Sequence, residues 1–233
     1  MQRSGYHRAW LRLWRGWIKP ILVVLVVVGT FRSAVADWND VPTQSMEPNI
    51  LVGDRIFVNK LAYDLKVPFT TWRIARWSDP QPGDVVVFFH PHTGKRMVKR
   101  IIGTPGDRVQ MRNNGILING QAASYQPVVF SAADQAMLTD APPYQFVNEQ
   151  LGSATHPVMA QPRRRSRRSF SAVTVPPGHY LVLGDNRDNS GDSRVFGFVE
   201  RDLIVGEVVG LAFSLDHDRY YLPRWKRFFR TIP

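Results

Sequence analysis

The longest apolar run of the chain lies near its N-terminus, at residues 18–36 (IKPILVVLVVVGTFRSAVA). Its uncharged core, Pro20 to Phe31, is shorter than the about 20 residues that a membrane-spanning helix needs. Lys19 and Arg32 can extend the span, because long basic side chains near a helix end reach the interface. Tryptophans flank the run as in an aromatic belt, at Trp14, Trp17 and Trp38. The pattern therefore predicts a transmembrane helix over residues 18–36.

A cleavable signal peptide is the alternative interpretation of the same run. A basic start, a short apolar stretch and the sequence AVA before Asp37 all match such a peptide. We favour a retained anchor. Cleavage after Ala36 would separate the following domain from the membrane, which does not agree with the motifs described below. Positive residues favour the cytoplasmic side of a membrane. We therefore expect residues 1–17 to form a basic cytoplasmic tail and residues 37–233 to form an extracytoplasmic domain.

After Trp38, short runs of β-branched and aromatic residues are separated by Gly, Pro or Asn, a pattern typical of strands and turns. Such runs predict strands at residues 54–63, 83–90, 97–103, 106–112, 115–121, 179–185 and 203–215. The sequence Asn-Asn-Gly at residues 113–115 is a strong signal for a hairpin turn. The predicted fold class is mostly β, with an N-terminal transmembrane helix followed by a largely antiparallel β domain.

One part of the β domain differs in composition from the rest. Residues 122–178 are richer in Ala, Gln, Pro and Arg, and we expect them to form an inserted, less regular lobe. The core of the domain is then about residues 37–121 and 179–218. The tail carries apolar residues spaced for one face of a short helix, at Leu222, Trp225 and Phe229.

The formal net charge of +11 is concentrated in two places. Residues 1–19 contain basic residues and no acidic one, and Arg163–Arg168 reads RRRSRR. The remainder is close to neutral, whereas a nucleic-acid-binding domain spreads its basic residues over a folded face. We therefore expect no nucleic-acid partner. We interpret the arginine run as solvated charge, with contact to anionic lipid as the alternative. The absence of cysteine excludes disulfides, thiolate metal sites and cysteine nucleophiles.

The segment VPTQSMEPN, residues 41–49, places Ser45 between two turn-forming prolines just beyond the apolar run. A serine hydroxyl becomes an effective nucleophile only when a neighbouring base takes its proton. Histidine is one candidate base, at His7, His90, His92, His156, His179 and His217. No histidines have the HExxH spacing of a metalloenzyme, and we interpret the HPH sequence at residues 90–92 as a surface turn.

A lysine is the other candidate base. Lys99 lies in the predicted strand MVKRIIG, on the face of Met97 and Ile101 and opposite Val98 and Arg100. This alternation predicts that Lys99 points inward and Arg100 outward. Burial lowers the pKa of a lysine below its ordinary value of about 10.4, so that the amine can be neutral and act as a base. The alternative is a lysine whose ammonium merely reaches the surface.

The segment GDNRDNSGDSR, residues 184–194, is too polar and turn-rich to follow a buried strand for packing reasons. Its density of Asp, Asn and Gly suggests a loop or a calcium site. However, it lacks the Glu that closes an EF-hand loop. Ser190 in this segment could hold the lysine amine by a hydrogen bond, as the third group that orients a base.

Four segments, in this order behind an apolar span, resemble the type I signal peptidases, membrane-anchored Ser-Lys serine proteases that remove signal peptides from exported proteins. They read PTQSMEPNILVGD, GDVVVFF, KRIIGTPGD and GDNRDNSGDSRVFGFV. The resemblance implies that Ser45 is the nucleophile and Lys99 the general base. It implies that Thr43 helps the Ser45 N–H to hold the oxyanion, and that Ser190 orients Lys99. Thr43 and Gln44 depart from the family pattern, in which serine and glycine are frequent at these positions.

The resemblance also implies two ion pairs that shape the site, Arg100 with Asp185 and Asp192 with Arg194. It implies a small apolar pocket that accepts alanine one and three residues before the cut, drawn from Val41, Pro42, Met46, Ile50, Met97 and Val98. It implies no cofactor and no metal. The expected partners are signal sequences of exported preproteins and membrane lipid. The expected enzyme is a single-pass monomer of the bacterial cytoplasmic (inner) membrane, with its catalytic domain on the periplasmic side.

Two other functions are compatible with parts of this pattern. A Ser-Lys autopeptidase of the SOS-repressor kind shares the dyad, but it would carry a DNA-binding domain in place of the anchor. A non-enzymatic, membrane-tethered β domain would use its basic segments to bind lipid or a partner, and it would not need Ser45 or Lys99. The apolar N-terminal run and the segment at residues 184–194 favour the peptidase.

Overall fold

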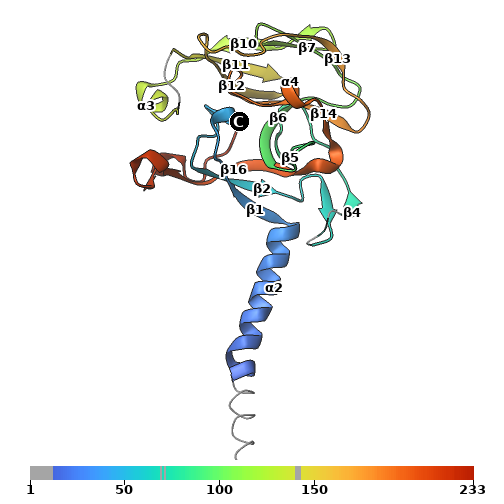
Figure 1. Ribbon diagram of the computed structural model, residues 1–233, viewed down its shortest axis with the longest axis vertical. Helices are drawn as coiled ribbons and strands as arrows, with labels where there is room; N and C mark the ends of the chain where they lie inside the picture. The colour runs from blue at the N-terminus through green and yellow to red at the C-terminus, as the bar shows by residue number, and fades with distance from the viewer. Residues whose placement is uncertain (1–12, 69, 71, 140–142) are drawn as a thin grey trace, which may run out of the picture.

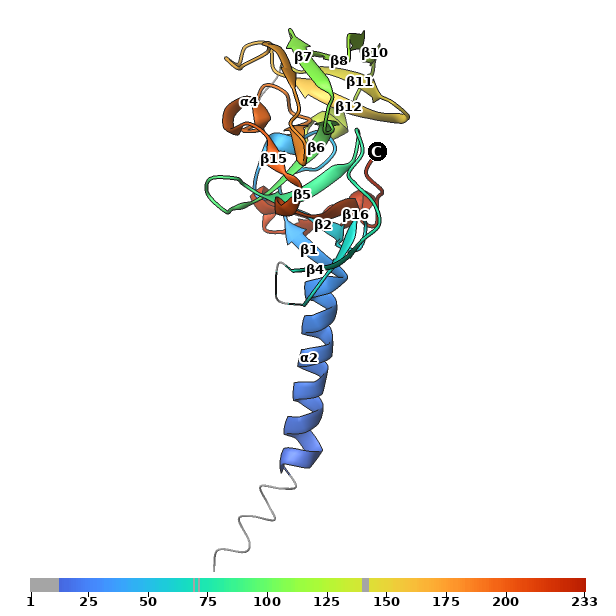
Figure 2. The same ribbon diagram turned by 90° about the vertical axis from the view of Figure 1, so that its right-hand side faces the viewer.

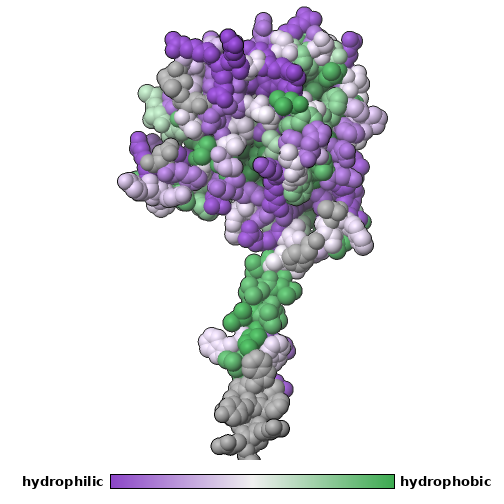
Figure 3. Space-filling model, in the orientation of Figure 1, coloured by the Kyte–Doolittle hydropathy of each residue, from purple (hydrophilic) through white to green (hydrophobic). Residues whose placement is uncertain are grey.

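The computed structural model describes residues 13–68, 70, 72–139 and 143–233. It begins with a π-helical turn, η1 (Trp14–Ile18), that continues into helix α2 (Lys19–Ala34). The continuous helix of 21 residues is long and apolar enough to cross a membrane, and it rises by about 31 Å. It stands out from the domain as a stalk of hydrophobic side chains (Figures 1 and 3). The first part of the predicted basic tail, residues 1–12, lies outside the described residues.

One large antiparallel sheet forms the part of the domain next to α2 (Figure 1). Its order is β1-β2-β16-β5-β6-β14-β15, with β17 alongside β16. The strands are β1 (Ala36–Asp40), β2 (Asp54–Asn59), β5 (Val85–Phe89), β6 (Arg96–Gly103), β14 (His179–Leu183), β15 (Val199–Glu200), β16 (Ile204–Asp216) and β17 (Leu222–Pro223). The sheet confirms the prediction of a mostly β, largely antiparallel fold.

A second layer of strands forms the end of the molecule farthest from α2 (Figures 1 and 2). A four-stranded sheet has the order β13-β7-β8-β9 and a three-stranded sheet the order β10-β11-β12. The strands are β7 (Arg108–Arg112), β8 (Gly115–Ile118), β9 (Gln121–Ala122), β10 (Ser124–Pro127), β11 (Gln145–Leu151), β12 (Ala154–Ala160) and β13 (Phe170–Thr174). The predicted hairpin turn between β7 and β8 is confirmed by positive φ angles of 48° at Asn113 and 67° at Asn114.

The expectation that residues 122–178 are less regular is wrong. They contain β10, β11, β12 and β13, and β11 pairs with β12 along seven residues of each strand. Polar residues occupy the exposed strand positions, which hid the strand pattern in the sequence. In addition, β13 pairs with β7, so one sheet joins residues from both sides of position 121. We call this second layer, β7 to β13, the lobe.

The remaining elements are short. A ribbon of β3 (Asp64–Lys66) and β4 (Arg73–Arg76) lies beside the upper end of α2 (Figures 1 and 2). The short helices are η2 (Gln44–Met46), α3 (Ala132–Gln135), α4 (Ser193–Phe196), η3 (Arg201–Leu203), η4 (His217–Arg219) and η5 (Trp225–Arg227). The predicted tail helix is wrong, because the tail forms only β17 and η5. Arg227 is buried there and pairs with Asp54 at 2.6 Å, which fixes the tail to β2.

Strands β5 and β6 lie at the centre of the domain, between three apolar clusters. Val85 and Val87 pack with residues of β2, β16 and the segment that carries Ser45. Val86 and Phe88 alternate with them and pack with Ile101 of β6 and with β14. Ile102 of β6 belongs to the cluster that joins the sheet to the lobe. Both faces of these strands are therefore covered, which explains why their sequences read as continuous apolar runs.

Candidate active site

The segment that carries Ser45 is held as a tight loop between β1 and β2. The Val41 N–H donates to the carbonyl of Asp54, and the Gly53 N–H donates to the carbonyl of Val41, both at 3.1 Å. Ser45 lies inside the single turn of η2 and is buried. The Asn186 N–H donates to the Ser45 carbonyl at 3.1 Å. The serine is thus fixed from both sides, by β2 and by the loop at residues 184–194.

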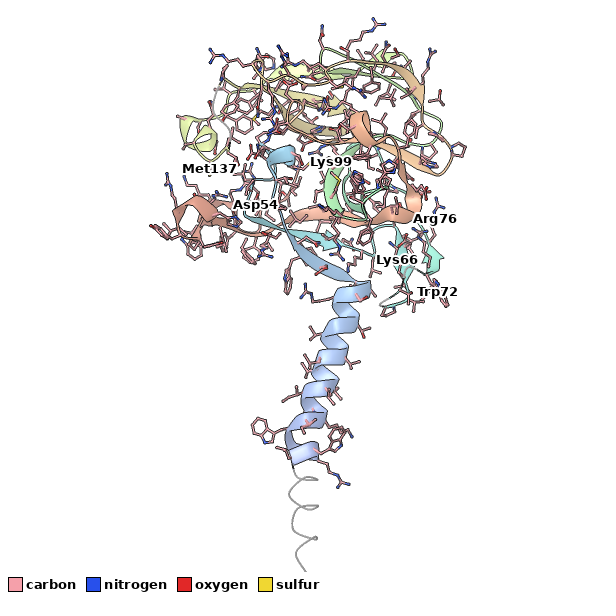
Figure 4. The ribbon with its side chains drawn as sticks, in the orientation of Figure 1. Asp54, Lys66, Trp72, Arg76, Lys99 and Met137 are labelled. Atoms are coloured by element: carbon pink, nitrogen blue, oxygen red, sulfur yellow. The ribbon has the colours of Figure 1, made fainter. Side chains whose placement is uncertain are left out.

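Lys99 projects from β6 toward this loop (Figure 4). Its Nζ lies 2.7 Å from Ser45 Oγ and 2.7 Å from the carbonyl oxygen of Val98. The side chain is 2% exposed. Burial lowers the pKa of Lys99 to about 8, although Asp192 and Asp185 at longer range act to raise it. Among the described residues no carboxylate pairs with this amine, so a large share of Lys99 is neutral at mildly alkaline pH.

The contacts of Ser45 decide between the two candidate bases. Its hydroxyl lies within hydrogen-bond distance of Lys99 and, at 3.4 Å, of Thr43. Within the part of the chain that the structure describes, no histidine forms a hydrogen bond with Ser45. His156 is fully buried in the lobe, where its Nε2 lies 3.3 Å from Glu149 Oε1. The geometry favours lysine over a Ser-His-Asp arrangement.

Of the two predicted auxiliary hydroxyls, only that of Thr43 contacts the Ser45 side chain. The Ser190 Oγ is buried beside the Asp192 carboxylate, and among the described residues no hydrogen bond joins it to Lys99. It packs against Gly184, where an added Cβ would lie 2.3 Å from Ser190 Oγ and 2.4 Å from the Ser45 carbonyl oxygen. Only glycine therefore lets the loop at residues 184–194 approach Ser45 this closely.

Both predicted ion pairs form. Arg100 donates to Asp185 through Nε at 2.9 Å and Nη2 at 2.8 Å, and Arg194 donates to Asp192 at 2.8 and 2.7 Å. Burial acts to raise the pKa of Asp185 and of Asp192, but the paired arginine outweighs it and lowers both. The prediction that Arg100 points outward to solvent is wrong. Arg100 is 1% exposed, because the lobe covers the face of β6 opposite Lys99.

Two asparagines that the sequence analysis missed join the segments of the site. Asn49 Nδ2 donates to Asp185 Oδ2 at 2.7 Å and to the carbonyl of Pro157 in β12 at 2.8 Å. Asn186 Nδ2 donates to the carbonyl of Gln44 at 3.2 Å. Both residues lie in segments that the sequence singles out for other residues, Asn49 in residues 41–49 and Asn186 in residues 184–194. Their polarity next to buried segments was the available signal.

The arginine run braces the loop at residues 184–194. Arg168 Nε donates to Asp188 Oδ1 at 2.9 Å, and Ser166 also donates to Asp188. Arg167 and Arg194 each donate to the carbonyl of the other. The interpretation as solvated charge is therefore wrong for Arg168, although Arg163 and the two arginines after it are exposed.

A cavity of about 410 Å³ opens beside Ser45 and Lys99, between β1 and the first residues of β6. It contains nearly all of the apolar residues predicted to form a substrate pocket, namely Val41, Pro42, Met46, Met97 and Val98. Ile50, the remaining one, is fully buried in the cluster beneath the cavity and does not line it. Its lining also includes Asn39, Lys95 and Arg96.

The sequence that forms this fold and site matches a known family of hydrolases. Residues 14–213 match the family model described as signal peptidase, peptidase S26, and the chain belongs to that family. It is therefore a serine peptidase. A signal peptidase I of Pseudomonas fluorescens is 32% identical over 222 residues, 90% of this chain and 76% of the relative. A signal peptidase I of Pseudomonas aeruginosa is 34% identical over 205 residues, 84% of this chain and 70% of the relative.

The comparison with solved structures gives a further match. The crystal structure of a signal peptidase I from Enterococcus faecalis is 30% identical in sequence, with a TM-score of 0.34. The match covers 56% of this chain and 97% of the other.

Proposed function

We propose that this protein is a membrane-bound serine endopeptidase that removes signal peptides from exported preproteins with a Ser45–Lys99 dyad, cutting after Ala-x-Ala. Family membership and the names of the relatives support a signal peptidase. The observation that carries the dyad is the 2.7 Å distance between Lys99 Nζ and Ser45 Oγ, at a buried lysine that no carboxylate of the described residues pairs with.

In this mechanism, neutral Lys99 accepts the Ser45 proton while Ser45 Oγ attacks the carbonyl carbon of the scissile bond. The ammonium of Lys99 then donates that proton to the departing amine of the mature protein. A water molecule next attacks the acyl-enzyme, with Lys99 again as the base, and releases the signal peptide as a carboxylic acid. The low dielectric around Lys99 favours its neutral form before each of the two proton transfers.

The oxyanion is held by the Ser45 N–H and the Thr43 hydroxyl. Thr43 Oγ1 lies 3.4 Å from Ser45 Oγ, and both residues line the cavity. A negatively charged oxygen beside the serine can therefore accept from both groups. Ser190 has the role of holding the lysine amine once a substrate is bound, and its hydroxyl is buried in the loop at residues 184–194, which packs against Ser45.

Specificity for small residues follows from the cavity walls. Val41, Met46, Met97 and Val98 leave an apolar surface in which a methyl group is the natural occupant. A larger or charged side chain would have to displace a packed residue or lose its water, and either costs free energy. The enzyme thus requires alanine-like side chains close to the cut.

The anchor places this chemistry at the membrane surface. Residues 1–17 form the cytoplasmic tail, residues 18–36 span the bacterial inner membrane, and the catalytic domain from residue 37 onward faces the periplasm. The exposed apolar surface of α2 and the domain that follows it support this arrangement. An enzymatic reporter fused after Pro233 should be active when it is of a type that folds only outside the cytoplasm. Activity of a cytoplasm-only reporter at that position would contradict the topology.

The activity is tested with the purified full chain in detergent micelles and a preprotein that carries Ala-x-Ala before its cut. Mass spectrometry should show cleavage directly after the second alanine. Ser45→Ala should reduce the rate by about 10³-fold or more, as when the nucleophile of other serine peptidases is removed. Ser153→Ala, in an exposed turn of the lobe, is the matched control and should cleave at the wild-type rate. Mature product formed by Ser45→Ala at the wild-type rate would contradict the proposal.

A further inference from the structure

A second cavity, of about 700 Å³, lies where α2 enters the domain. Its walls include the last residues of α2, Ser33 and Ala34, together with Lys60, Lys66, Trp72 and Arg96. Lys66 and Trp72 lie beside the upper end of α2, on the side of the domain that carries the β3–β4 ribbon (Figure 4). We call this cavity the basal groove. It is distinct from the cavity at Ser45, which Arg96 alone shares with it.

The two lysines of the basal groove are largely buried, and the contacts closest to their amines are backbone carbonyls, with one carboxylate at longer ion-pair distance from each. Lys60 Nζ donates to the carbonyls of Arg32 and Ser33, at 2.6 and 3.2 Å, and its nearest carboxylate oxygen, on Asp37, is 3.7 Å away. Lys66 Nζ donates to the carbonyl of Ile204 at 2.8 Å. An ammonium has three N–H donors, so Lys66, with one hydrogen bond, can donate further to an anion, and Lys60 has one donor left whose nearest carboxylate is 3.7 Å away.

The carboxylates near these lysines are already bonded to arginines. Asp37 accepts from Arg32 at 2.6 Å. Asp64, which lies 3.6 Å from Lys66, accepts from Arg73 at 2.9 Å and from Arg201 at 3.0 Å. The acid on the groove wall, Asp202, is mostly exposed and pairs with the same Arg73. Arg96 of the groove also donates to Asp37, at 3.4 Å. Lys60, Lys66 and Arg96 therefore share Asp37 and Asp64 with three further arginines, and the cations around the groove outnumber the carboxylates.

The electrostatics agree with an anionic ligand. Burial is the main cause that lowers the pKa of Lys60 and of Lys66 below the ordinary lysine value. A bound anion would offset this cost of burial, because an opposite charge within hydrogen-bond distance favours the ammonium form.

The position of the groove indicates where the anion comes from. The helix from Trp14 to Ala34 rises by about 31 Å, which matches the roughly 30 Å hydrocarbon core of a bilayer. Residue Ala34 therefore lies at the level of the lipid phosphates. Next to the groove, Trp72 and Ile74 are 75% and 62% exposed on the β3–β4 ribbon. Exposed Trp beside cationic side chains is typical of the headgroup layer.

From this placement we propose that the basal groove binds the phosphate of one anionic phospholipid of the outer leaflet, through Lys60, Lys66 and Arg96. Trp72 and Ala34 lie where the glycerol and the first part of an acyl chain would pass. The proposal rests on insertion of α2 into the bilayer, but it does not depend on the chemistry at Ser45.

Native mass spectrometry of the full chain, released from detergent micelles that contain defined lipid, tests the proposal. We expect retention of one phosphatidylglycerol, and at least tenfold less retention of phosphatidylcholine. Lys60→Gln/Lys66→Gln should retain phosphatidylglycerol about tenfold less well, because charge-assisted hydrogen bonds are lost. Lys60→Arg/Lys66→Arg should retain it as the wild type does. Arg108→Gln/Arg112→Gln, which removes two exposed charges of the lobe, is the charge-matched control and should also behave as wild type.

Several results would overturn the proposal. Wild-type retention of phosphatidylglycerol by Lys60→Gln/Lys66→Gln would do so, provided that thermal unfolding shows the variant to be folded. Displacement of the lipid by equimolar glycerol phosphate would show a site for free phosphate. If Lys60→Gln/Lys66→Gln lowered cleavage of a water-soluble peptide in lipid-free micelles as much as it lowered lipid retention, the groove would be a site for substrate. Ser45→Ala should retain lipid as the wild type does, which separates this test from that of the peptidase.

Discussion

The buried ionisable side chains at the active site and in the lobe differ in how their charges are paired. At the active site, Lys99 is buried, and its close contacts are the Ser45 hydroxyl and a backbone carbonyl. In the lobe, Glu149 is equally buried, but Arg187 donates to both of its oxygens.

The pKa values follow this difference. Burial would raise the pKa of Glu149, but Arg187 outweighs it, and the pKa lies well below its ordinary range. Burial likewise acts to lower the pKa of Arg187, and Glu149 raises it in turn. Lys99 has no such partner, so burial prevails and its pKa falls to about 8. Paired burial keeps a charge fixed, whereas unpaired burial makes a base.

The two clusters are connected through the loop at residues 184–194. Arg187 lies in the loop at residues 184–194 and donates to the carbonyl of Gly184 at 3.3 Å. His156, at 3.3 Å from Glu149, lies 4.0 Å from Asp185, which pairs with Arg100 beside Lys99 on β6. The charged cluster of the lobe therefore supports the loop at residues 184–194, which packs against Ser45. The neutral amine of Lys99 lies on the other side of Ser45 from this cluster.

The largest expected effect comes from replacing the unpaired lysine. Lys99→Met should lower the rate of preprotein cleavage by about 10³-fold or more, because Ser45 loses its base. The same variant should be more stable than wild type below pH 8, by up to about 3 kcal/mol, since about 2.5 pKa units of unfavourable burial are removed.

The pH dependence of this gain has a definite sign. The folded pKa of Lys99 is below its unfolded value of 10.5, so protons favour the unfolded wild-type chain. The difference in the free energy of unfolding between Lys99→Met and wild type should therefore shrink as pH rises from 8 to 10.5. Urea unfolding at pH 7 and pH 10 measures it. A variant less stable than wild type at pH 7 would contradict the unpaired state of Lys99.

The converse change, in the paired cluster, should destabilise the fold. Glu149→Gln leaves the Arg187 guanidinium buried without its counterion, and the free energy of unfolding should fall by about 3 kcal/mol or more. Glu149→Leu/Arg187→Met, which removes both charges, should recover most of that loss. Thermal unfolding of the three proteins compares them. Equal stability of Glu149→Gln and wild type would contradict the pairing.

A smaller effect is expected in the arginine run. Arg168→Gln removes the ion pair with Asp188 and should reduce the cleavage rate several-fold through the loop at residues 184–194, with a stability loss of about 1 kcal/mol. Arg163→Gln, at the exposed start of the same arginine run, is the matched control and should change neither quantity. If the two variants behave alike, Arg168 does not brace the site.

Features that depend on local pattern could be predicted from the sequence. The apolar helix, the hairpin at Asn113 and Asn114, and the inward position of Lys99 each follow from spacing along one segment. The Ser45 and Lys99 pair could be predicted only through the resemblance, because 54 residues separate them in the chain. The alternation along β6 indicated two faces, but it gave no sign that the lobe covers the face of Arg100.

The lobe and the tail were predicted poorly for related reasons. The strands of the lobe alternate buried and exposed positions with few β-branched residues, so composition suggested irregular structure. In the tail, apolar spacing indicated a helix, whereas the ion pair between Arg227 and Asp54 fixes a different path. Asn49 is similar, since its two acceptors lie 108 and 136 residues away. Such contacts between distant segments leave no periodic signal.

The pH profile of kcat/KM for preprotein cleavage tests the unpaired state of Lys99 most directly. Only the neutral amine can take the Ser45 proton, so log(kcat/KM) should rise by one unit per pH unit up to an apparent pKa of about 8 and then level off. A profile that is flat between pH 6 and pH 10, in a preparation that stays folded over that range, would contradict a lysine base.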